Sequence, residues 1–300
     1  MTKHAKIVEV GPRDGLQNES VAVATADKIA FVNRLSEAGH MAIEVAAFVS
    51  ARRVPQMADA AEVFAGISRR PGTKYAALVP NVTGLERAID AGADEAAIFA
   101  AASESFSRSN INQTIAESLD TYRTVCARAS EARLPVRAYV STAFGCPFEG
   151  AIDPAAVATV SAALMDMGAY EIAISDTIGI AHPGQIGPLL NEVTRRVPIE
   201  RIAFHFHDTR GTALANVLMA LQLGVTAFDA SAGGLGGCPY APGATGNLAT
   251  EDLLYMLDGL GVETAVSLAK VLDASTFIEE KVGHPLASRY ATAHKAARAR

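Results

Sequence analysis

One stretch of alternating apolar and polar residues organises the reading of this sequence: Ala203-Phe204-His205-Phe206-His207-Asp208-Thr209. Alternation with a period of two predicts a β-strand. Residues i and i+2 of a strand face the same side, so His205 and His207 should lie next to each other. Two neutral imidazoles held in this way are well placed to bind one metal ion. An isolated His-x-His can also be a pair of structural histidines. The residues elsewhere in the chain indicate whether this pair binds a metal or is only structural.

Eight short apolar runs, this one included, recur along the chain, and many are apolar on both faces, as buried parallel strands are. They lie at residues 7–10, 42–45, 75–79, 95–99, 136–140, 171–175, 202–207 and 227–231. Amphipathic helical patterns separate them, at residues 26–38, 59–68, 83–91, 115–132, 154–167, 183–196 and 212–223. Several of these patterns end at a Gly just before the next strand, which is typical of helix termini.

Alternation of this kind predicts an α/β protein with a (β/α)8 TIM barrel, since eight such units fit into about 250 residues. A doubly wound sheet is the structural alternative. We expect one catalytic domain over residues 1–300, with the barrel at about 5–250 and two or three C-terminal helices at about 251–300. The sequence contains no linker or low-complexity tract that would divide it.

Composition excludes several classes of function. The formal net charge is -6, whereas proteins that bind nucleic acids or membrane surfaces usually carry a basic face. No run of about twenty apolar residues is present, so no membrane span is expected. Residues 1–4 lead directly into the first strand, which leaves no room for a signal or transit peptide. The three cysteines, at positions 126, 146 and 238, form no disulfide framework. These features favour a cytoplasmic protein.

Polar residues follow the strands at the end where TIM barrels carry their catalytic groups. Carboxylates and histidines are rarely buried at strand ends unless they have a partner or a function there. The residues concerned are Arg13 and Asp14 after the first strand, Glu44 at the end of the second, Asp176 after the sixth, the two histidines of the seventh, and Cys238 in a Gly-rich loop after the eighth.

Asp14 is the natural anionic partner for the histidine pair. In isolation, an Asp next to Gly could be a simple turn former. Two His and one carboxylate would leave coordination positions open for water or a substrate oxygen. Asn247 could supply a fourth, carbonyl oxygen, or could instead begin the helix that follows it. Oxygen-rich ligation favours Mg²⁺ or Mn²⁺ over a structural zinc, although the pattern alone would also allow iron.

Arg13 and Cys238 are candidates for the chemistry itself. A guanidinium stays charged and could stabilise a developing enolate oxygen, and Glu44 is the plausible buried partner of Arg13. A Cys on a Gly-rich loop at the mouth of a barrel suggests a proton donor or nucleophile. The Gly run does not open a helix directly after a strand, so we reject a dinucleotide-binding loop.

Taken together, these stretches resemble the 3-hydroxy-3-methylglutaryl-CoA (HMG-CoA) lyase family of metal-dependent barrel lyases, over nearly all of residues 5–265. The similar segments are residues 10–19, 48–50 with 54–57, 175–179, 205–209, 234–241 and 246–252. The Arg-Asp-Gly and His-x-His elements are shared with a wider superfamily that includes isopropylmalate-type synthases. The Gly-rich loop with its Cys is specific to the lyases.

The resemblance implies cleavage of HMG-CoA into acetyl-CoA and acetoacetate with a divalent metal, Mg²⁺ or Mn²⁺. It implies an acyl-CoA substrate, and we also expect a homodimer or higher homo-oligomer. The implied metal ligands are Asp14, His205, His207 and Asn247. Arg13 would contact the substrate carbonyl with support from Glu44, Cys238 would be the active-site cysteine, and His205 or Asp14 would act as base. Asn110 and Asp176 would be groups near the substrate.

Four positions depart from the pattern expected of animal-type members: Ala46, Ala47, Ala173 and Arg210. We expect them near the mouth of the barrel, where they could change the acyl specificity. A lyase for a related 3-hydroxyacyl-CoA, such as citramalyl-CoA, is therefore one alternative. A Claisen-condensing synthase and a non-catalytic metal-binding barrel are the others.

Overall fold

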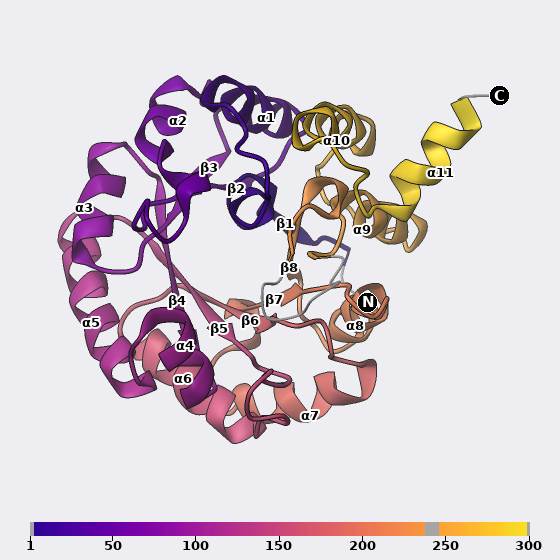
Figure 1. The fold of residues 1–300 in the computed structure, drawn as a ribbon. Helices are drawn as coiled ribbons and strands as arrows, with labels where there is room; N and C mark the ends of the chain where they lie inside the picture. The colour runs from indigo at the N-terminus through magenta and orange to yellow at the C-terminus, as the bar shows by residue number, and fades with distance from the viewer. Residues whose placement is uncertain (1–2, 238–245, 299–300) are drawn as a thin grey trace.

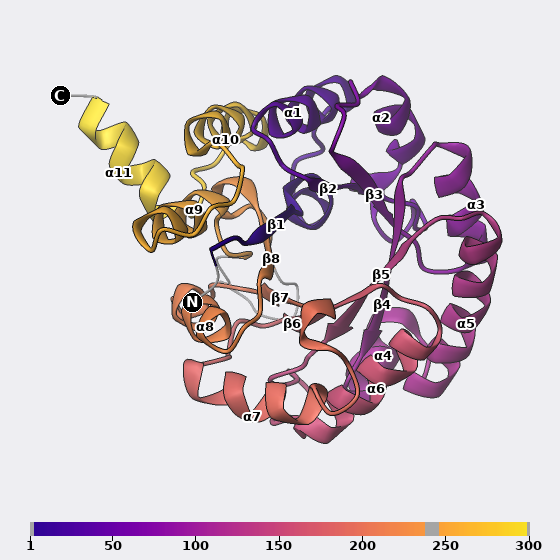
Figure 2. The same cartoon turned by 180° about the vertical axis from the view of Figure 1, so that it is seen from behind.

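The computed structural model describes residues 3–237 and 246–298, which form a closed barrel of eight parallel strands. Neighbouring strands pair in sequence order from β1 to β8, and β8 closes the barrel against β1 (Figures 1 and 2). The strands are β1 (Lys6–Glu9), β2 (Ala42–Ala47), β3 (Lys74–Leu78), β4 (Glu95–Ala101), β5 (Val136–Ser141), β6 (Glu171–Asp176), β7 (Ile202–Phe206) and β8 (Ala227–Ala230). Each coincides with one of the eight predicted runs to within two residues at either end, so the predicted barrel is confirmed.

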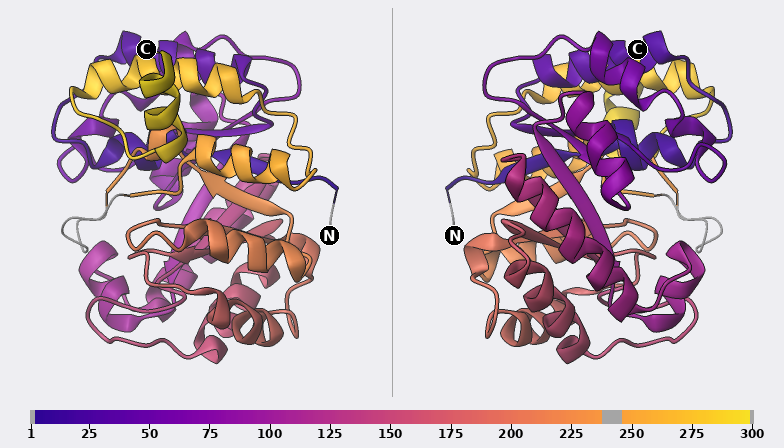
Figure 3. Two further views of the ribbon diagram at one scale, coloured as in Figure 1. Left: turned by 90° about the vertical axis from the view of Figure 1, so that its right-hand side faces the viewer. Right: turned by 90° about the vertical axis from the view of Figure 1, so that its left-hand side faces the viewer.

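Helices surround the strands on the outside of the barrel (Figures 1 and 3). They are α1 (Thr25–Glu37), α2 (Ala60–Gly66), α3 (Val82–Asp90), α4 (Glu104–Ile111), α5 (Ile115–Glu131), α6 (Pro154–Asp166), α7 (Pro183–Val193) and α8 (Ala213–Gln222). Three more follow the barrel, α9 (Thr250–Gly259), α10 (Leu268–Val282) and α11 (Arg289–Arg298), as expected for the C-terminal region. Within the described residues, no helix is long and apolar enough to cross a bilayer.

Local sequence explains where the helices begin and end. Thr114 and Glu117 form a capping box at the start of α5, which satisfies amide groups that the first turn leaves open. The glycines predicted to stop helices adopt left-handed backbone, as at Gly39, with φ of 99°. A Cβ at Gly39 would lie 2.6 Å from the carbonyl oxygen of Ala265. Only Gly fits there without strain.

Two elements near the rim were not predicted. Residues Gly11–Gly15 form a single π-helical turn directly after β1. Residues Glu104–Ile111 form α4 in the connection that follows β4. The side chain of Ser103 caps α4 by accepting a hydrogen bond from the amide of Phe106. The first element carries Arg13 and Asp14, and α4 carries Asn110.

The barrel core is apolar for most of its length, with Phe204 and Phe228 fully buried. Several strands also carry buried charged residues, and three of these form one group: Arg137 from β5, Glu171 from β6 and Asp229 from β8. TIM-barrel interiors are usually filled by branched apolar side chains. The charged group is therefore unusual for a barrel of this kind.

Candidate active site and metal centre

The C-terminal ends of the strands open into a cavity of about 580 Å³. Its lining includes five of the residues singled out from the sequence: Arg13, Asp14, Asn110, His205 and His207. They come from the turn after β1, from α4, and from β7 with the residue that follows it. Residues far apart in the sequence thus meet at the end of the barrel where such enzymes carry their active sites.

Asp14, His205 and His207 form a group that could hold a metal ion, with one ligand atom of each residue within 4.8 Å of the others. The Nε2 atoms of His205 and His207 lie 3.9 and 4.0 Å from Oδ2 of Asp14. Two imidazoles and a carboxylate make a donor set suited to a divalent ion with positions open for substrate. The predicted convergence of these three side chains is found.

Asn247 lies directly beside this group. Its backbone pairs with that of His207, and its Nδ2 donates to Oδ2 of Asp14 at 2.9 Å. Its Oδ1 atom is buried and has no hydrogen-bond partner among the described residues. A buried acceptor without a donor costs about 1–3 kcal/mol. An amide oxygen is a ligand that suits a hard cation, so the donor types of the four residues fit a divalent ion of the magnesium type.

The turn after β1 explains why Arg13 and Asp14 lie at the rim. The amides of Arg13, Asp14 and Gly15 all converge on the carbonyl oxygen of Val10. Pro12 occupies an early position of this π-helical turn, where its missing N–H is no loss. The turn thereby presents a guanidinium and a carboxylate from adjacent residues to the cavity.

Arg13 is held between two carboxylates. Its Nε donates to Oε1 of Glu44, and its Nη1 donates to Oδ1 of Asp14 at 2.5 Å. The hydroxyl of Tyr139 donates to the other oxygen of Glu44 at 2.7 Å. Burial lowers the pKa of Arg13, but Glu44 and Asp14 raise it by more, so the guanidinium remains charged. The predicted contact between Glu44 and Arg13 is present.

The charges around Asp14 and the burial of His207 favour the protonation states that bind a cation. Burial alone would raise the pKa of Asp14, but Arg13 and the two histidines hold it well below its usual range, so Asp14 is an anion. Burial, with His205 nearby, lowers the pKa of His207 to about 4 and keeps it neutral. Burial also lowers the pKa of His205, but Asp229 and Asp14 raise it by more. An anion and a neutral imidazole are the forms that bind metals.

The remaining predicted residues have different positions. Asn110 on α4 reaches the cavity. Asp176 is buried, and its two carboxylate oxygens accept hydrogen bonds from the amides of Ile180 and Ala181. Among the described residues, the cavity lining does not include it. Burial raises the pKa of Asp176 to about 6. Cys238 lies outside the described residues.

Four departures from the family pattern, Ala46, Ala47, Ala173 and Arg210, were expected near the mouth. In the described part of the chain, none of them belongs to the lining of the cavity. The three alanines are buried in β2 and β6. The Nη1 atom of Arg210 donates to the carbonyls of Ile178 and Gly179, so it braces the loop after β6.

The sequence analysis did not predict the buried polar residues that lie behind the site in the barrel interior. Tyr139 and Arg137 of β5, Asp229 of β8 and Glu9 of β1 are buried and hydrogen-bonded to residues of the rim or to each other. A signal for them existed, because each is a polar residue inside a predicted apolar strand. Such residues are rarely buried unless they are paired.

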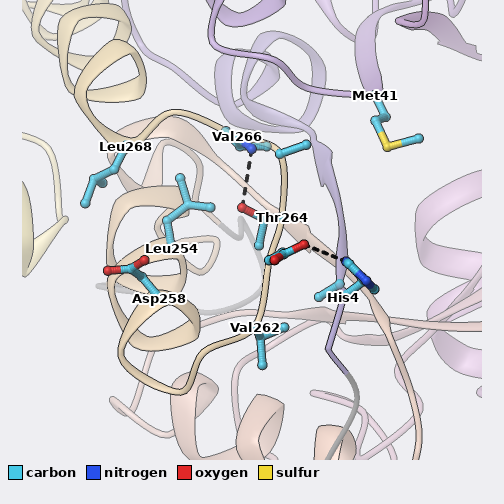
Figure 4. Close-up of a pocket in the computed structure, with 11 residues that line it drawn as sticks. His4, Met41, Leu254, Asp258, Val262, Thr264, Val266 and Leu268 are labelled. Carbon is cyan, nitrogen blue, oxygen red and sulfur yellow. Dashed lines mark hydrogen bonds and ion pairs between the residues drawn. The ribbon is translucent and has the colours of Figure 1, made fainter.

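A second cavity, of about 610 Å³, lies at the opposite end of the barrel, where β1 begins (Figure 4). Its polar lining residues include His4 and Glu263, whose Nδ1 and Oε2 atoms lie 3.2 Å apart. Apolar side chains such as Met41, Leu254 and Leu268 make up much of the rest. The metal-binding group lines the other cavity, which is therefore the candidate active site.

Comparisons with known proteins identify relatives of the whole chain. The HMGL-like family model matches residues 4–278. The chain is 52% identical over 298 residues to a cytoplasmic 3-hydroxy-3-methylglutaryl-CoA lyase of Rattus norvegicus, covering 99% of this chain and 87% of that protein. It superposes on a hydroxymethylglutaryl-CoA lyase of Pseudomonas aeruginosa with a TM-score of 0.97, at 50% identity over 99% of both chains.

A third relative, an HMG-CoA lyase of Acinetobacter baumannii, was solved in complex with coenzyme A and 3-methylmalate. It is 38% identical to this chain, with a TM-score of 0.93, and the match covers 98% of this chain and 97% of that one. The family model and the relatives each span almost the whole chain. The protein belongs to the HMGL-like family.

Proposed function

We propose that this protein is a carbon–carbon lyase that cleaves HMG-CoA into acetyl-CoA and acetoacetate, with Mg²⁺ or Mn²⁺ as its metal. The observation that carries the proposal is the group formed by Asp14, His205 and His207 at the end of the barrel, in a chain that is 52% identical to a lyase of this activity over nearly its full length. The acyl-CoA substrate is supported by the relative that was solved with coenzyme A.

Asp14, His205, His207 and Asn247 would hold the ion. The chemistry that a divalent ion supplies when bound is a lower pKa for the tertiary hydroxyl of the substrate. A side chain at the site, His205 or Asp14, removes that hydroxyl proton. Asn110, on the wall of the cavity, would contact the substrate. Asp176 supports the loop after β6 through the two amides that it accepts.

Bond cleavage then follows from the charges at the rim. The bond between C2 and C3 breaks, C3 becomes the ketone carbon of acetoacetate, and the electron pair passes into the thioester enolate. Arg13, fixed by Glu44 and Asp14, stabilises the enolate oxygen. Cys238 donates the proton that converts C2 into the methyl group of acetyl-CoA. This order conserves protons and electrons without a further co-reactant.

The test is a panel of 3-hydroxyacyl-CoA thioesters that includes HMG-CoA and citramalyl-CoA. Each is incubated with the purified protein and Mg²⁺ or Mn²⁺, and the release of acetyl-CoA and of the ketone product is measured. We expect the highest kcat/KM for HMG-CoA. Preference for citramalyl-CoA would replace the substrate assignment, and release of acetyl-CoA from none of them would refute lyase activity. A condensing synthase would instead form a thioester from acetyl-CoA and a keto acid.

The homodimer or higher oligomer and the cytoplasmic location stay predictions. Light scattering coupled to size-exclusion chromatography measures the first directly, since the chain mass is 31.3 kDa. Cell fractionation measures the second.

A further inference from the structure

A line of buried ion pairs runs through the barrel interior and ends at the metal-binding group. Arg137 is 1% exposed and is bound by two carboxylates. Its Nε donates to Oε1 of Glu171 at 2.7 Å, and its Nη2 donates to Oδ1 of Asp229 at 2.7 Å. Burying charges is expensive, and buried ion pairs often add little net stability. The desolvation penalty of these ion pairs indicates that they serve a role other than folding stability.

Asp229 links the line to His205. Its Oδ2 atom is 3.2 Å from Nη1 of Arg137 and 3.2 Å from Nδ1 of His205. Arginine is always protonated and only donates. The carboxylate between them can therefore only accept from both sides. This requires the proton of a neutral His205 ring to be on Nδ1 and leaves the lone pair on Nε2, which lies 3.9 Å from Oδ2 of Asp14.

His207 provides an internal comparison. Its Nδ1 atom is buried and has no hydrogen-bond partner among the described residues. The two histidines of the pair therefore differ, because only His205 has an acceptor behind it. A carboxylate behind a ligating histidine fixes its ring orientation and its tautomer.

We infer that Asp229, clamped by Arg137, is a positioning residue that holds His205 with Nδ1 protonated and Nε2 open to a divalent cation. The inference rests on the proposed metal-dependent function, since it assigns a role in holding the same ion. It also bears on the base. With both ring nitrogens engaged, a His205 that holds the ion has no free lone pair for a substrate proton.

Asp229→Asn tests the inference, because the amide keeps the size of the side chain and can donate to Nδ1, which turns the proton of His205 onto Nε2. The measurement is the affinity for Mn²⁺ alone, without substrate, from the electron paramagnetic resonance signal of free Mn²⁺ in a titration. We expect the affinity to fall tenfold to a hundredfold, as for other outer-shell partners of metal ligands. Circular dichroism establishes that the titrated protein is folded.

Glu171→Gln is the matched control. It removes the other carboxylate bound to Arg137, but Glu171 has no contact with His205 in the structure. We expect a change in Mn²⁺ affinity of less than twofold. Equal losses from Asp229→Asn and Glu171→Gln would show a general effect of disturbing the buried charges, which would overturn the inference. If Asp229→Asn does not fold, Arg137→Lys loosens the clamp instead, and wild-type affinity in that variant would likewise overturn it.

A double-mutant cycle separates positioning from general loosening. In a His205→Ala background, Asp229→Asn should cause no further loss of Mn²⁺ affinity, because its target is gone. Full additivity of the two losses would overturn the inference. Wild-type protein that binds Mn²⁺ but cleaves no thioester would refute the proposed function and leave the inference standing. Wild-type Mn²⁺ affinity in Asp229→Asn would refute the inference and leave the proposed function standing.

Discussion

Replacing Arg13 separates the two tasks that the structure gives it. Its guanidinium bonds Glu44 and Asp14 at once and also lines the cavity. Arg13→Lys keeps the charge but offers a single ammonium group, which cannot reproduce the planar fork. Arg13→Met removes the charge entirely. The two variants should therefore differ in stability more than in turnover.

The expected losses of unfolding free energy follow from the burial of Arg13 and Glu44. Glu44 is 1% exposed, so Arg13→Met leaves it with Tyr139 as its remaining donor. Breaking a buried pair in this way destabilises a protein by about 3–5 kcal/mol. Arg13→Lys should cost only about 1–2 kcal/mol, in the range of a weakened charged hydrogen bond. Loss of one donor aimed at developing charge lowers turnover by about 10²–10³. We expect that loss for Arg13→Lys, and about 10³ or more for Arg13→Met.

The assay is acetoacetate formation at saturating HMG-CoA and Mg²⁺, alongside urea unfolding of each variant. Arg128→Met is the matched control, because Arg128 forms an ion pair with Glu86 on the outer helices at 2.6 Å. It should leave kcat unchanged and cost less than about 1 kcal/mol. A kcat within tenfold of wild type for either Arg13 variant would refute the role assigned to this residue.

Three further outcomes are expected. Treatment with a chelator should abolish cleavage, and Mg²⁺ or Mn²⁺ should restore it. Gly236→Ala should weaken Mn²⁺ binding at least tenfold (~1.4 kcal/mol), since Gly236 has φ of 122° and a Cβ there would lie 2.7 Å from Nδ2 of Asn247. Glu9→Gln should flatten the pH dependence of the unfolding free energy. Burial raises the pKa of Glu9 to about 8, so wild type should lose stability as the pH rises from about 5 to 8, by up to about 1.4 kcal/mol per pH unit.

Each outcome has a measurement that can contradict it. Undiminished cleavage after complete demetallation, checked by elemental analysis, would exclude a metal-dependent mechanism. Gly259→Ala, where a Cβ meets nothing within 4 Å, is the control for Gly236→Ala, and equal Mn²⁺ affinities in the two would contradict the steric argument. Parallel pH profiles for Glu9→Gln and wild type, from urea unfolding at pH 5.5 and 7.5, would show that Glu9 does not carry the slope.

The barrel could be predicted from the sequence because its signal repeats. Each strand is a short apolar run, the helices between them carry their own periodicity, and several end at a Gly, so an error in one unit does not change the architecture. The same holds for His205 and His207, whose spacing of two residues places them on one face of any strand.

The support behind the site could not be predicted in the same way. That Arg137 reaches Asp229, 92 residues further along the chain, depends on how the strands tilt and which residues face inward. Spacing within one strand carries no such information. Helix α4 was also missed, because a short helix in a loop has few residues to display a period. Its absence from the prediction left Asn110 without a structural position until the fold was known.

The bond between Asn247 and Asp14 joins residues 233 positions apart, and this has a consequence for biosynthesis. A ribosome must release the chain beyond residue 247 before the two ends of the ligand set can meet, in a barrel whose β8 pairs with β1. Nascent chains that stop short of this point would carry an exposed sheet edge and lack a complete binding group for the ion. Uptake of the ion would then mark the moment at which the barrel of the newly made enzyme has closed.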